Sequence, residues 1–596
     1  MKAGLRLLAA GAAFLFAGVA AAASVPARTV YDVSLFVQFD FPGLTEATLP
    51  ERIRDVRLAG ADGVTIALTE FFEDGERRVR SLARLKTAIA AFEREGFPVA
   101  VWTTSLGYGV DTDRDLIRRI PRRQALVSFN GKSCARCPTD LACRAAVCEN
   151  VRDFIRAGAK FILWDDDLVQ SCRPGLGCVC PAHMARLEVR LGRAVTTNEV
   201  ACSLAGASNA VRSAYLDVNG EALTEYCRAV RAAADEVDPS VGMGICASWT
   251  HYDCEGVEFR DVAKLLAGGG RRPFIRASGA TYWPIRSPRC RGLHLGSVME
   301  FVRWQIAEFR GTDVRLLDEN DPYPRSDRLV PAKLCELYDK VMVAEGDIVR
   351  NKYILRDYEG KIDPAYLAAH LENREEAVRL GTLFAGTGPC GFKVIYPRHQ
   401  IRAATIPPGT GMWAVAKAFS LPMAGVLVSL AGVPVHYERG AETPAIAFGE
   451  RAALALTEDD FRRGVILDAE GAKTLALKGV DVGREDGSLC RLCRNAAGGR
   501  FAILKKSHWD IDYTAKFAAE IRFEEIWSFF TGKALPLQVA GAPGVYLLAK
   551  ERRDGALAVL LCNMEREPTG RFAVKAGSRE SEHRLGAYAA ESFLVR

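Results

Sequence analysis

Short hydrophobic runs alternate with amphipathic stretches over the first two thirds of the chain. Most of these runs follow a segment whose apolar residues recur at helical spacing, and Gly96 ends one such segment. Eight runs have the length and composition of buried strands: 33–39, 63–70, 98–107, 160–167, 241–248, 273–279, 313–320 and 383–392. Eight such units predict a parallel sheet closed into a (β/α)8 TIM barrel over residues 30–400.

An open, doubly wound sheet is the alternative arrangement of the same units. Its dinucleotide-binding version carries Gly-x-Gly-x-x-Gly directly after the first strand, and this chain has no such turn there. The pattern therefore disfavours a dinucleotide-binding protein, and the barrel is the preferred architecture.

The pattern changes after about residue 400. Residues 422–438 and 464–483 have the pattern of further strand–helix units, which predicts a small, flavodoxin-like α/β domain over 401–495. Residues 496–596 are rich in strand-forming runs, and 544–565 has the pattern of a hairpin that turns at Asp554 and Gly555. We expect a C-terminal β-sandwich-like domain there.

The N-terminus has the pattern of a secretory signal peptide over residues 1–23. Lys2 and Arg6 form a charged start, an apolar stretch follows, and the small residues Ala21-Ala22-Ala23 precede the expected cleavage point. An uncleaved N-terminal membrane anchor is the alternative, and no other stretch is long and apolar enough to span a bilayer. We expect a secreted or periplasmic protein that has no membrane contact after cleavage.

The composition limits which classes of function are compatible with the chain. The 596 residues include 79 basic and 73 acidic side chains, a net charge of +6, without a dense basic segment interleaved with aromatics. Nucleic-acid binding is therefore not indicated. The chain holds 17 cysteines, and in an oxidising compartment this odd number leaves at least one outside any disulfide.

Acidic residues stand at the ends of two predicted strands. Asp165, Asp166 and Asp167 end the fourth, and Asp318, Glu319 and Asp321 end the seventh. The active site of a (β/α)8 barrel lies at the carboxyl ends of its strands, so these groups should face one another. Further polar and aromatic side chains are expected at the same end: Gln38, Asp40, Glu70, Trp102, Trp249, His251, Arg276, Tyr282 and Trp283. Paired carboxylates among aromatic faces suit a sugar substrate.

Each candidate also has a simpler interpretation. The three aspartates could cap a helix in a solvated loop or bind Ca²⁺ or Mg²⁺. Glu319 could form a structural salt bridge, His251 could be a satisfied polar residue rather than a general base, and Arg276 could neutralise the acids around it. Because acidic residues stand at the ends of two strands, a catalytic role is favoured over each of these simpler interpretations.

Two segments resemble the glycoside hydrolase family 42 β-galactosidases and their clan A relatives. WDDDLVQSCRPGLGCVCPAHMARL (164–187) is similar to their fourth-strand segment, in which Asn-Glu-Tyr precedes a cysteine cluster and a helix. LLDENDPYPRSD (316–327) is similar to their nucleophile segment, a Glu followed by a Pro-containing turn and an Arg. The order of barrel, small α/β domain and β-domain matches as well.

The resemblance implies roles for individual residues. Glu319 takes the position of the nucleophile, Asp167 that of the acid/base Glu, and Asp166 that of the preceding Asn. Aspartate is one methylene shorter than glutamate, so this chain departs from the family at its acid/base. The resemblance further implies a retaining mechanism on β-galactoside-type sugars and, through the middle domain, a homo-oligomer such as a trimer.

The cysteines after the aspartates resemble the metal-binding cluster of the same family. Cys178-x-Cys180-x-x-His183 supplies three ligands, and an upstream segment with Cys134, Cys137, Cys143 and Cys148 offers the fourth. The predicted ligands of a structural zinc ion are Cys137, Cys178, Cys180 and His183. Disulfides among these cysteines are the alternative. Cys490 and Cys493, in another domain, are expected to form a local disulfide or to be two free thiols.

The sequence thus predicts a retaining glycoside hydrolase that binds a carbohydrate and needs no cofactor for catalysis. Two alternatives stay open. A carbohydrate-binding protein without activity could use the same scaffold, and a metal-dependent barrel hydrolase could use the aspartates as ligands.

Overall fold

The computed structural model describes most of the chain. The described ranges are 28–68, 75–107, 125–127, 133–170, 177–252, 254–282, 294–322, 330–352, 363–408, 422–484, 486–542 and 544–596. The predicted signal peptide, Glu70 and Trp283 lie outside them. Among the helices described, none combines the length and the apolar content needed to cross a bilayer.

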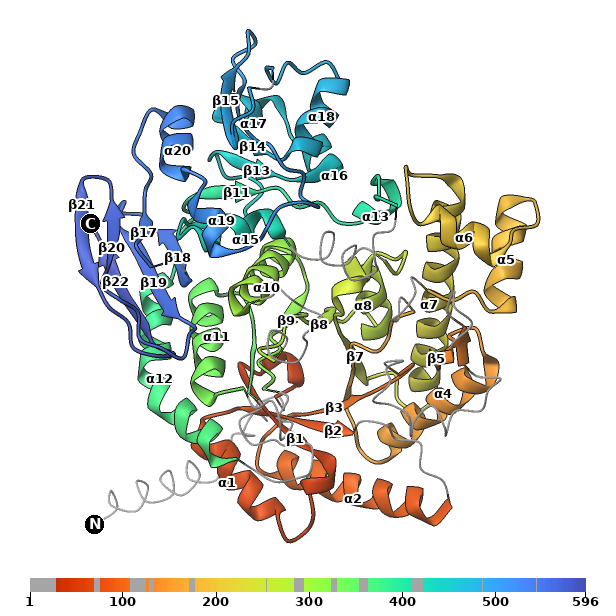
Figure 1. Cartoon of the computed structure of the whole chain (residues 1–596). Helices are drawn as coiled ribbons and strands as arrows, with labels where there is room; N and C mark the ends of the chain where they lie inside the picture. Colours follow the sequence, from red (N-terminus) through yellow and green to blue (C-terminus); the bar gives the residue numbers. More distant parts are fainter. Residues whose placement is uncertain are drawn as a thin grey trace, which may run out of the picture.

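Eight parallel strands form the first sheet, in the order β10-β1-β2-β3-β6-β7-β8-β9 (Figure 1). Parallel bridges between Leu317 and Val349 and between Asn320 and Lys352 join β9 to β10 and close the barrel. The strands are β1 (Leu35–Asp40), β2 (Gly63–Leu68), β3 (Val99–Thr103), β6 (Phe161–Trp164), β7 (Gly242–Cys246), β8 (Phe274–Arg276), β9 (Arg315–Leu317) and β10 (Arg350–Lys352). The predicted (β/α)8 barrel is confirmed.

Helices surround this barrel, and buried side chains fill its interior. Along each strand, alternate residues point inward and outward. Phe36, Phe161 and Phe274 pack inside the barrel, whereas Val101 and Ile162 pack outward against helices. The surrounding helices are α1 (Leu49–Ala59), α2 (Gly75–Arg94), α4 (Leu141–Arg156), α7 (Ala210–Asp235), α8 (Phe259–Ala267), α10 (Leu295–Phe309), α11 (Ala332–Glu345) and α12 (Pro364–Phe384), with α5 (Pro181–Leu191) and α6 (Thr197–Ser203) inserted before α7.

The eighth strand is not the predicted segment 383–392. It is β10, whose sequence is Arg-Asn-Lys and whose Asn351 and Lys352 are buried. Lys352 Nζ lies 3.0 Å from a carboxylate oxygen of Glu336 and 3.0 Å from one of Asp339, both on α11. These ion pairs compensate the buried charge, so a polar strand occupies a position where a hydrophobic run was expected.

The segment after α12 begins a second sheet. Strand β11 (Phe392–Val394) lies in the order β12-β11-β13-β14-β16-β15, in which only β15 is antiparallel to its neighbour. Its other strands are β12 (Val435–His436), β13 (Ala445–Ala447), β14 (Val465–Leu467), β15 (Cys490–Arg494) and β16 (Arg500–Leu504), and its helices include α15 (Met423–Leu430), α16 (Gly449–Leu454), α17 (Glu458–Arg463) and α18 (Ala469–Leu477). This sheet therefore extends past the predicted range 401–495 at both ends.

The C-terminal part packs two antiparallel three-stranded sheets against a common core. One sheet holds β17 (Gln538–Ala540), β20 (Phe572–Ala576) and β21 (Arg579–His583), and the other β18 (Val545–Glu551), β19 (Leu557–Asn563) and β22 (Ala590–Val595). Leu547, Leu561 and Val574 belong to their shared core. Strands β18 and β19 pair from Glu551 and Leu557 onward, which confirms the predicted hairpin. Short helices α19 (Ala515–Ala519) and α20 (Phe523–Thr531) precede these sheets.

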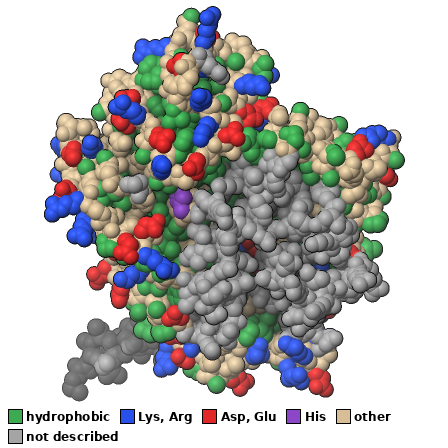
Figure 2. All heavy atoms as spheres, viewed as in Figure 1, with side chains coloured by type: hydrophobic (Ala, Val, Ile, Leu, Met, Phe, Trp, Pro, Cys, Tyr) green, Lys and Arg blue, Asp and Glu red, His purple; other side chains and the backbone are tan. Residues whose placement is uncertain are grey.

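One buried carboxylate connects the three parts of the molecule. Glu300 on α10 accepts hydrogen bonds of 2.7 Å from Tyr437, after β12, and from Tyr546 on β18. Arg303 on the same helix donates to Glu300 at 2.7 Å and to Val435 O at 2.8 Å. On the described surface of the face in Figure 2, acidic and basic side chains are interspersed.

Candidate active site

The inward side of the strands carries polar residues at the carboxyl end of the barrel. Because side chains alternate, Asp165 has the parity of the inward Leu163, and Arg276 that of Phe274. Glu319 follows Leu317 in the same way. These positions bring the predicted residues of three strands together.

Arg276 links the two acidic strand ends. Its Nη2 atom lies 3.0 Å from Oε1 of Glu319 and 3.3 Å from Oδ1 of Asp165, and all three residues are at most 2% exposed. Because both oxygens contact the same nitrogen, the carboxylates of Asp165 and Glu319 lie beside each other. The acidic ends of β6 and β9 therefore meet at the mouth of the barrel.

Glu319 is held at both of its oxygens. Arg276 donates to Oε1, and the backbone N–H of Gly279 donates to Oε2 at 3.0 Å. Burial raises the pKa of Glu319 to about 8, against the lowering effect of Arg276, and the nearby carboxylates Asp166 and Asp321 raise it further. The carboxyl group is thus fixed in orientation by two donors.

The three consecutive aspartates have different surroundings. Asp165 accepts a hydrogen bond from Arg276 and one of 2.8 Å from the N–H of Asp166. Burial raises its pKa well above the usual value, and Asp166 adds to this effect. Asp166 itself is half-buried, whereas both of its neighbours are buried.

Asp167 points toward the loop after β3. Its carboxylate accepts backbone hydrogen bonds from Ser105 at 2.7 Å and from Gly107 at 2.6 Å. Burial raises its pKa to about 7, although these two N–H groups lower it. A carboxylate used in this way positions a loop, so the geometry disagrees with the expectation that Asp167 faces the sugar. Asp166 is the more accessible candidate.

Other predicted residues have structural surroundings. Trp102 is 4% exposed in the inner core, and the guanidinium of Arg276 lies 5.3 Å from its ring centroid, so the ring supports Arg276 rather than forming an open platform. Gln38 is buried on β1 with the inward parity of Phe36, and Tyr282 is half-buried against the main core.

His251 is a buried, neutral structural residue. Its Nδ1 accepts a hydrogen bond of 2.6 Å from the N–H of Ser248, and its Nε2 donates to Leu168 O at 2.9 Å. Burial lowers the pKa of His251 to about 4, and its ring stacks on Phe259 at 4.2 Å between centroids. The prediction of a sugar contact is therefore not supported. His251 instead holds the residue that follows the three aspartates.

Backbone donors are the functional groups that the sequence reasoning missed. Gly279 adopts a φ of 143°, and a Cβ atom there would lie 2.6 Å from Cγ2 of Val302. Only glycine lets the N–H reach Glu319 at this position. Residue type does not reveal such a donor, although a glycine at the end of a predicted strand is a usable signal.

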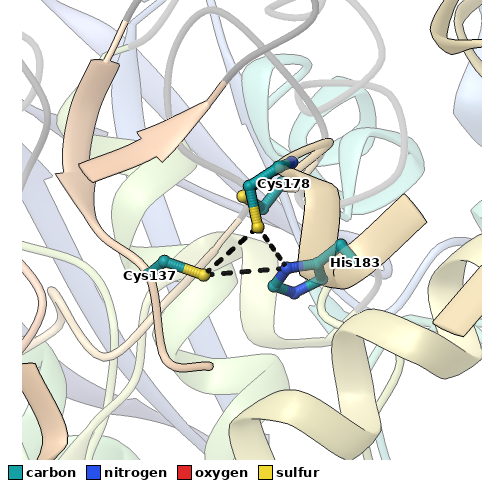
Figure 3. A group of neighbouring side chains, drawn as sticks. Cys137, Cys178 and His183 are labelled. Atoms are coloured by element: carbon teal, nitrogen blue, oxygen red, sulfur yellow. Dashed lines mark hydrogen bonds between the residues drawn. The ribbon is translucent and has the colours of Figure 1, made fainter. Parts of the chain in front are cut away.

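The four predicted metal ligands form a second cluster beside the aspartates. Their ligand atoms lie within 4.8 Å of one another, and all four side chains are buried. Figure 3 shows Cys137, Cys178 and His183 pointing toward one another. Cys137 Sγ is 3.8 Å from Cys180 Sγ and 3.7 Å from His183 Nδ1. Ligands on one tetrahedral zinc ion are separated by roughly 3.5–3.8 Å for these atom types.

The surroundings of His183 also suit a metal ligand. Its Nε2 lies 2.8 Å from the side-chain oxygen of Gln170, so Nε2 carries the proton and Nδ1 is directed at the sulfur atoms. Metal-bound histidines usually donate their other nitrogen in this way. Gln170 is itself fixed, because its backbone N–H donates to Glu255 at 2.8 Å.

No disulfide joins Cys137, Cys143, Cys148, Cys178 or Cys180, whose side chains the structure describes as free thiols. Cys490 pairs with Leu504 and Cys493 with Phe501 on β15. Residues three apart on a strand point to opposite faces, so the predicted alternative of a local disulfide is wrong and that of two free thiols is confirmed.

Comparisons with known proteins agree with this architecture at the level of fold. Neither the models of protein families nor the curated proteins give a match to the chain. Solved structures do match over 94% of this chain and 98% of theirs: the β-galactosidase from Bacillus circulans sp. alkalophilus (TM-score 0.57, 11% identity), a catalytic mutant of a GH42 β-galactosidase from G. stearothermophilus (0.58, 11%) and the β-galactosidase from Rahnella sp. R3 (0.56, 12%).

The chain has the fold of the GH42 β-galactosidases. The match extends over the barrel, the second sheet and the C-terminal sheets, which is the order of parts expected from the sequence. At this level of identity the likeness establishes the architecture alone.

Proposed function

We propose that this protein is a retaining glycoside hydrolase that acts on β-linked, β-galactoside-type sugars. The observation that carries the proposal is the shared contact of Arg276 with Asp165 and Glu319, which joins the acidic ends of β6 and β9. The GH42 fold supports the same interpretation because its solved members include β-galactosidases.

In the first step, Glu319 is the nucleophile. Its ionised carboxylate attacks the anomeric carbon and forms a glycosyl ester, while the bond from that carbon to the glycosidic oxygen breaks. Arg276 favours the ionised form, and Gly279 N–H fixes the second oxygen. Asp166 donates a proton to the departing oxygen, so the aglycone leaves as an alcohol.

In the second step, Asp166 is the base. Its carboxylate removes a proton from a water molecule as that water attacks the anomeric carbon, and the ester bond to Glu319 breaks. Two inversions at one carbon give net retention. Asp165 and Asp167 act as positioning residues, because their carboxylates bind Arg276 and the backbone after β3.

The test is hydrolysis of a panel of nitrophenyl β-glycosides by the full-length protein, with the anomer of the first product followed by NMR. We expect turnover of the β-galactoside and initial release of the β-anomer. Release of the α-anomer would overturn the retaining mechanism. Sugar binding without turnover of any substrate would favour the non-catalytic alternative instead.

The metal-dependent alternative is less compatible with the described contacts. Two of the three aspartates direct their carboxylates at a guanidinium and at backbone N–H groups, which leaves few of their oxygens for an ion. Activity that persists after chelation would exclude this alternative.

We also propose a structural zinc ion held by Cys137, Cys178, Cys180 and His183. Four protein ligands leave no open position, so the ion would stabilise the loops after β3 and β6 and take no part in catalysis. Metal analysis of the purified protein should find zinc, and Cys180→Ser should lose the zinc ion of this cluster. The protein would be secreted or periplasmic and form a homo-oligomer such as a trimer, which cell fractionation and light scattering would test.

A further inference from the structure

A second group of potential metal ligands lies in the α/β part, at the carboxyl ends of parallel strands. Asp468 directly follows β14, Glu470 is in the first turn of α18, and His508 follows β16. Nδ1 of His508 is 3.1 Å from Oδ2 of Asp468 and 3.0 Å from Oε2 of Glu470. The three ligand atoms lie within 4.8 Å of one another.

The backbone orients Asp468 toward this point. Its Oδ1 accepts hydrogen bonds from the N–H groups of Gly449 at 2.8 Å and Gly471 at 2.9 Å, at the starts of α16 and α18. Its Oδ2 accepts the N–H of His508 at 2.8 Å and faces the imidazole. Gly449 has a φ of 80°, and a Cβ there would lie 3.0 Å from the His508 ring. Both the carboxylate and the ring are therefore fixed by their surroundings.

Asp468, Glu470 and His508 together carry a net negative charge. Nδ1 carries at most one proton, which can satisfy only one of the two carboxylate oxygens that face it. Oε2 of Glu470 is buried and accepts no hydrogen bond of good geometry within the described part of the chain. Even with a protonated imidazole, the two carboxylates leave one negative charge, at a place where the side chains of Asp468, His508 and Glu470 are 0%, 7% and 20% exposed.

We propose that Asp468, Glu470 and His508 bind a divalent transition-metal ion of the zinc class. Nitrogen and oxygen ligands about 2.1 Å from a tetrahedral ion are roughly 3.4 Å apart, so the observed separations need to widen by only a few tenths of an ångström. One imidazole and two carboxylates are ligands that such ions accept.

Three protein ligands leave the fourth position to water or to a small oxygen-donor anion. This open position distinguishes the site from the four-ligand cysteine cluster. It also lies where α/β sheets generally bind ligands, outside the carboxyl ends of β13, β14 and β16. The inference is independent of the proposed glycosidase activity.

Without a metal, the same residues would form an ion pair. Burial lowers the pKa of His508, but the nearby carboxylates of Asp468 and Glu470 raise it to about 9. An imidazolium would then occupy the position of the ion. Direct measurement of bound metal separates these two states.

The experiment uses the full-length protein, loaded with Zn²⁺ and freed of excess by gel filtration. We expect two zinc ions per chain in the parent protein and one in both Glu470→Gln and His508→Gln. Glu470→Gln keeps the shape of the side chain, and Glu458→Gln on α17, whose side chain is 84% exposed, is the matched control that should retain two. One zinc ion per chain in the parent, unchanged by either variant, would overturn the proposal.

Co²⁺ gives an independent readout of the ligands. In a Cys180→Ser background, bound cobalt should give weak d–d bands without the intense thiolate charge-transfer band, and Glu470→Gln should abolish them. Cobalt bands that persist unchanged in Glu470→Gln would contradict the assignment. If Cys180→Ser does not fold, the loss of one zinc ion in Glu470→Gln alone decides the question.

Discussion

Arg276 and Glu319 form a buried ion pair at the centre of the barrel mouth, with 3.0 Å between Nη2 and Oε1. The same nitrogen lies 3.3 Å from Asp165, so one guanidinium balances carboxylates from two strands. Removing one partner of such a pair leaves a buried charge without compensation. The acidic ends of β6 and β9 therefore depend on the same guanidinium for charge compensation.

The first prediction compares Asp166→Asn with Asp167→Asn. As the general acid/base, Asp166 should contribute a factor of about 10²–10⁴ to turnover of substrates with poor leaving groups. Activated nitrophenyl substrates should lose less, and azide should restore turnover and yield the β-glycosyl azide. Steady-state kinetics on both substrate types checks this.

Asp167→Asn should affect stability rather than proton transfer. Its carboxylate accepts two backbone N–H groups, so the change should cost about 1–3 kcal/mol of unfolding free energy. Azide rescue in Asp167→Asn but not in Asp166→Asn would restore Asp167 as the acid/base.

The second prediction concerns Glu319→Gln and the pH dependence of stability. The pKa of Glu319 is raised to about 8 in the folded protein, above its ordinary value of 4.5. Between these values the folded state binds more protons than the unfolded state, so this group makes stability fall as pH rises. Glu319→Gln should abolish activity. Its free energy of unfolding, compared with that of the parent protein, should increase as the pH rises.

Chemical denaturation at several pH values measures this difference. Glu580→Gln, at an exposed position on β21, is the control and should show none of the trend. A Glu319→Gln protein whose stability relative to the parent does not change with pH would show that Glu319 ionises normally.

The third prediction concerns His251, whose pKa is lowered to about 4 from 6.5. Between these values the unfolded state binds more protons, so the stability from neutral His251 is complete above pH 6.5 and is lost as pH falls toward 4. His251→Gln should cost about 1–3 kcal/mol near neutral pH through its lost hydrogen bonds. The cost should shrink on acidification, and a constant cost would be inconsistent with a buried neutral imidazole.

The fourth prediction tests the backbone donor to Glu319. In Gly279→Ala the new methyl group would meet Val302 and displace the N–H, so kcat/KM should fall by about tenfold or more, as expected for losing a hydrogen bond to a charged group. Gly311→Ala is the control, because Gly311 also has a positive φ but nothing lies within 4 Å of its added Cβ. Equal losses in both variants would indicate backbone strain alone.

The sequence predicted seven barrel strands because their residues are apolar, and it missed the eighth because Asn351 and Lys352 are polar. Lys352 is tolerated there only through Glu336 and Asp339, which lie on the preceding helix in the folded chain. The hydrophobicity pattern of the sequence does not predict ion pairs that compensate a buried charge.

The candidate site was predicted in part. Asp165, Arg276 and Glu319 converge as their strand ends indicated, and the family resemblance correctly grouped Cys178, Cys180 and His183. Position within a motif could not distinguish Asp166 from Asp167, because the partners of Asp167 are the backbone groups of a loop some sixty residues earlier.

The hydrogen bonds to Glu300 have a consequence for how the molecule unfolds. The barrel supplies Glu300 and Arg303, the second sheet supplies Tyr437, and the C-terminal sheets supply Tyr546. If any one of the three parts separated from the others, the buried carboxylate of Glu300 would lose a hydrogen-bond partner. Heating should therefore melt the chain in a single cooperative transition rather than one part at a time.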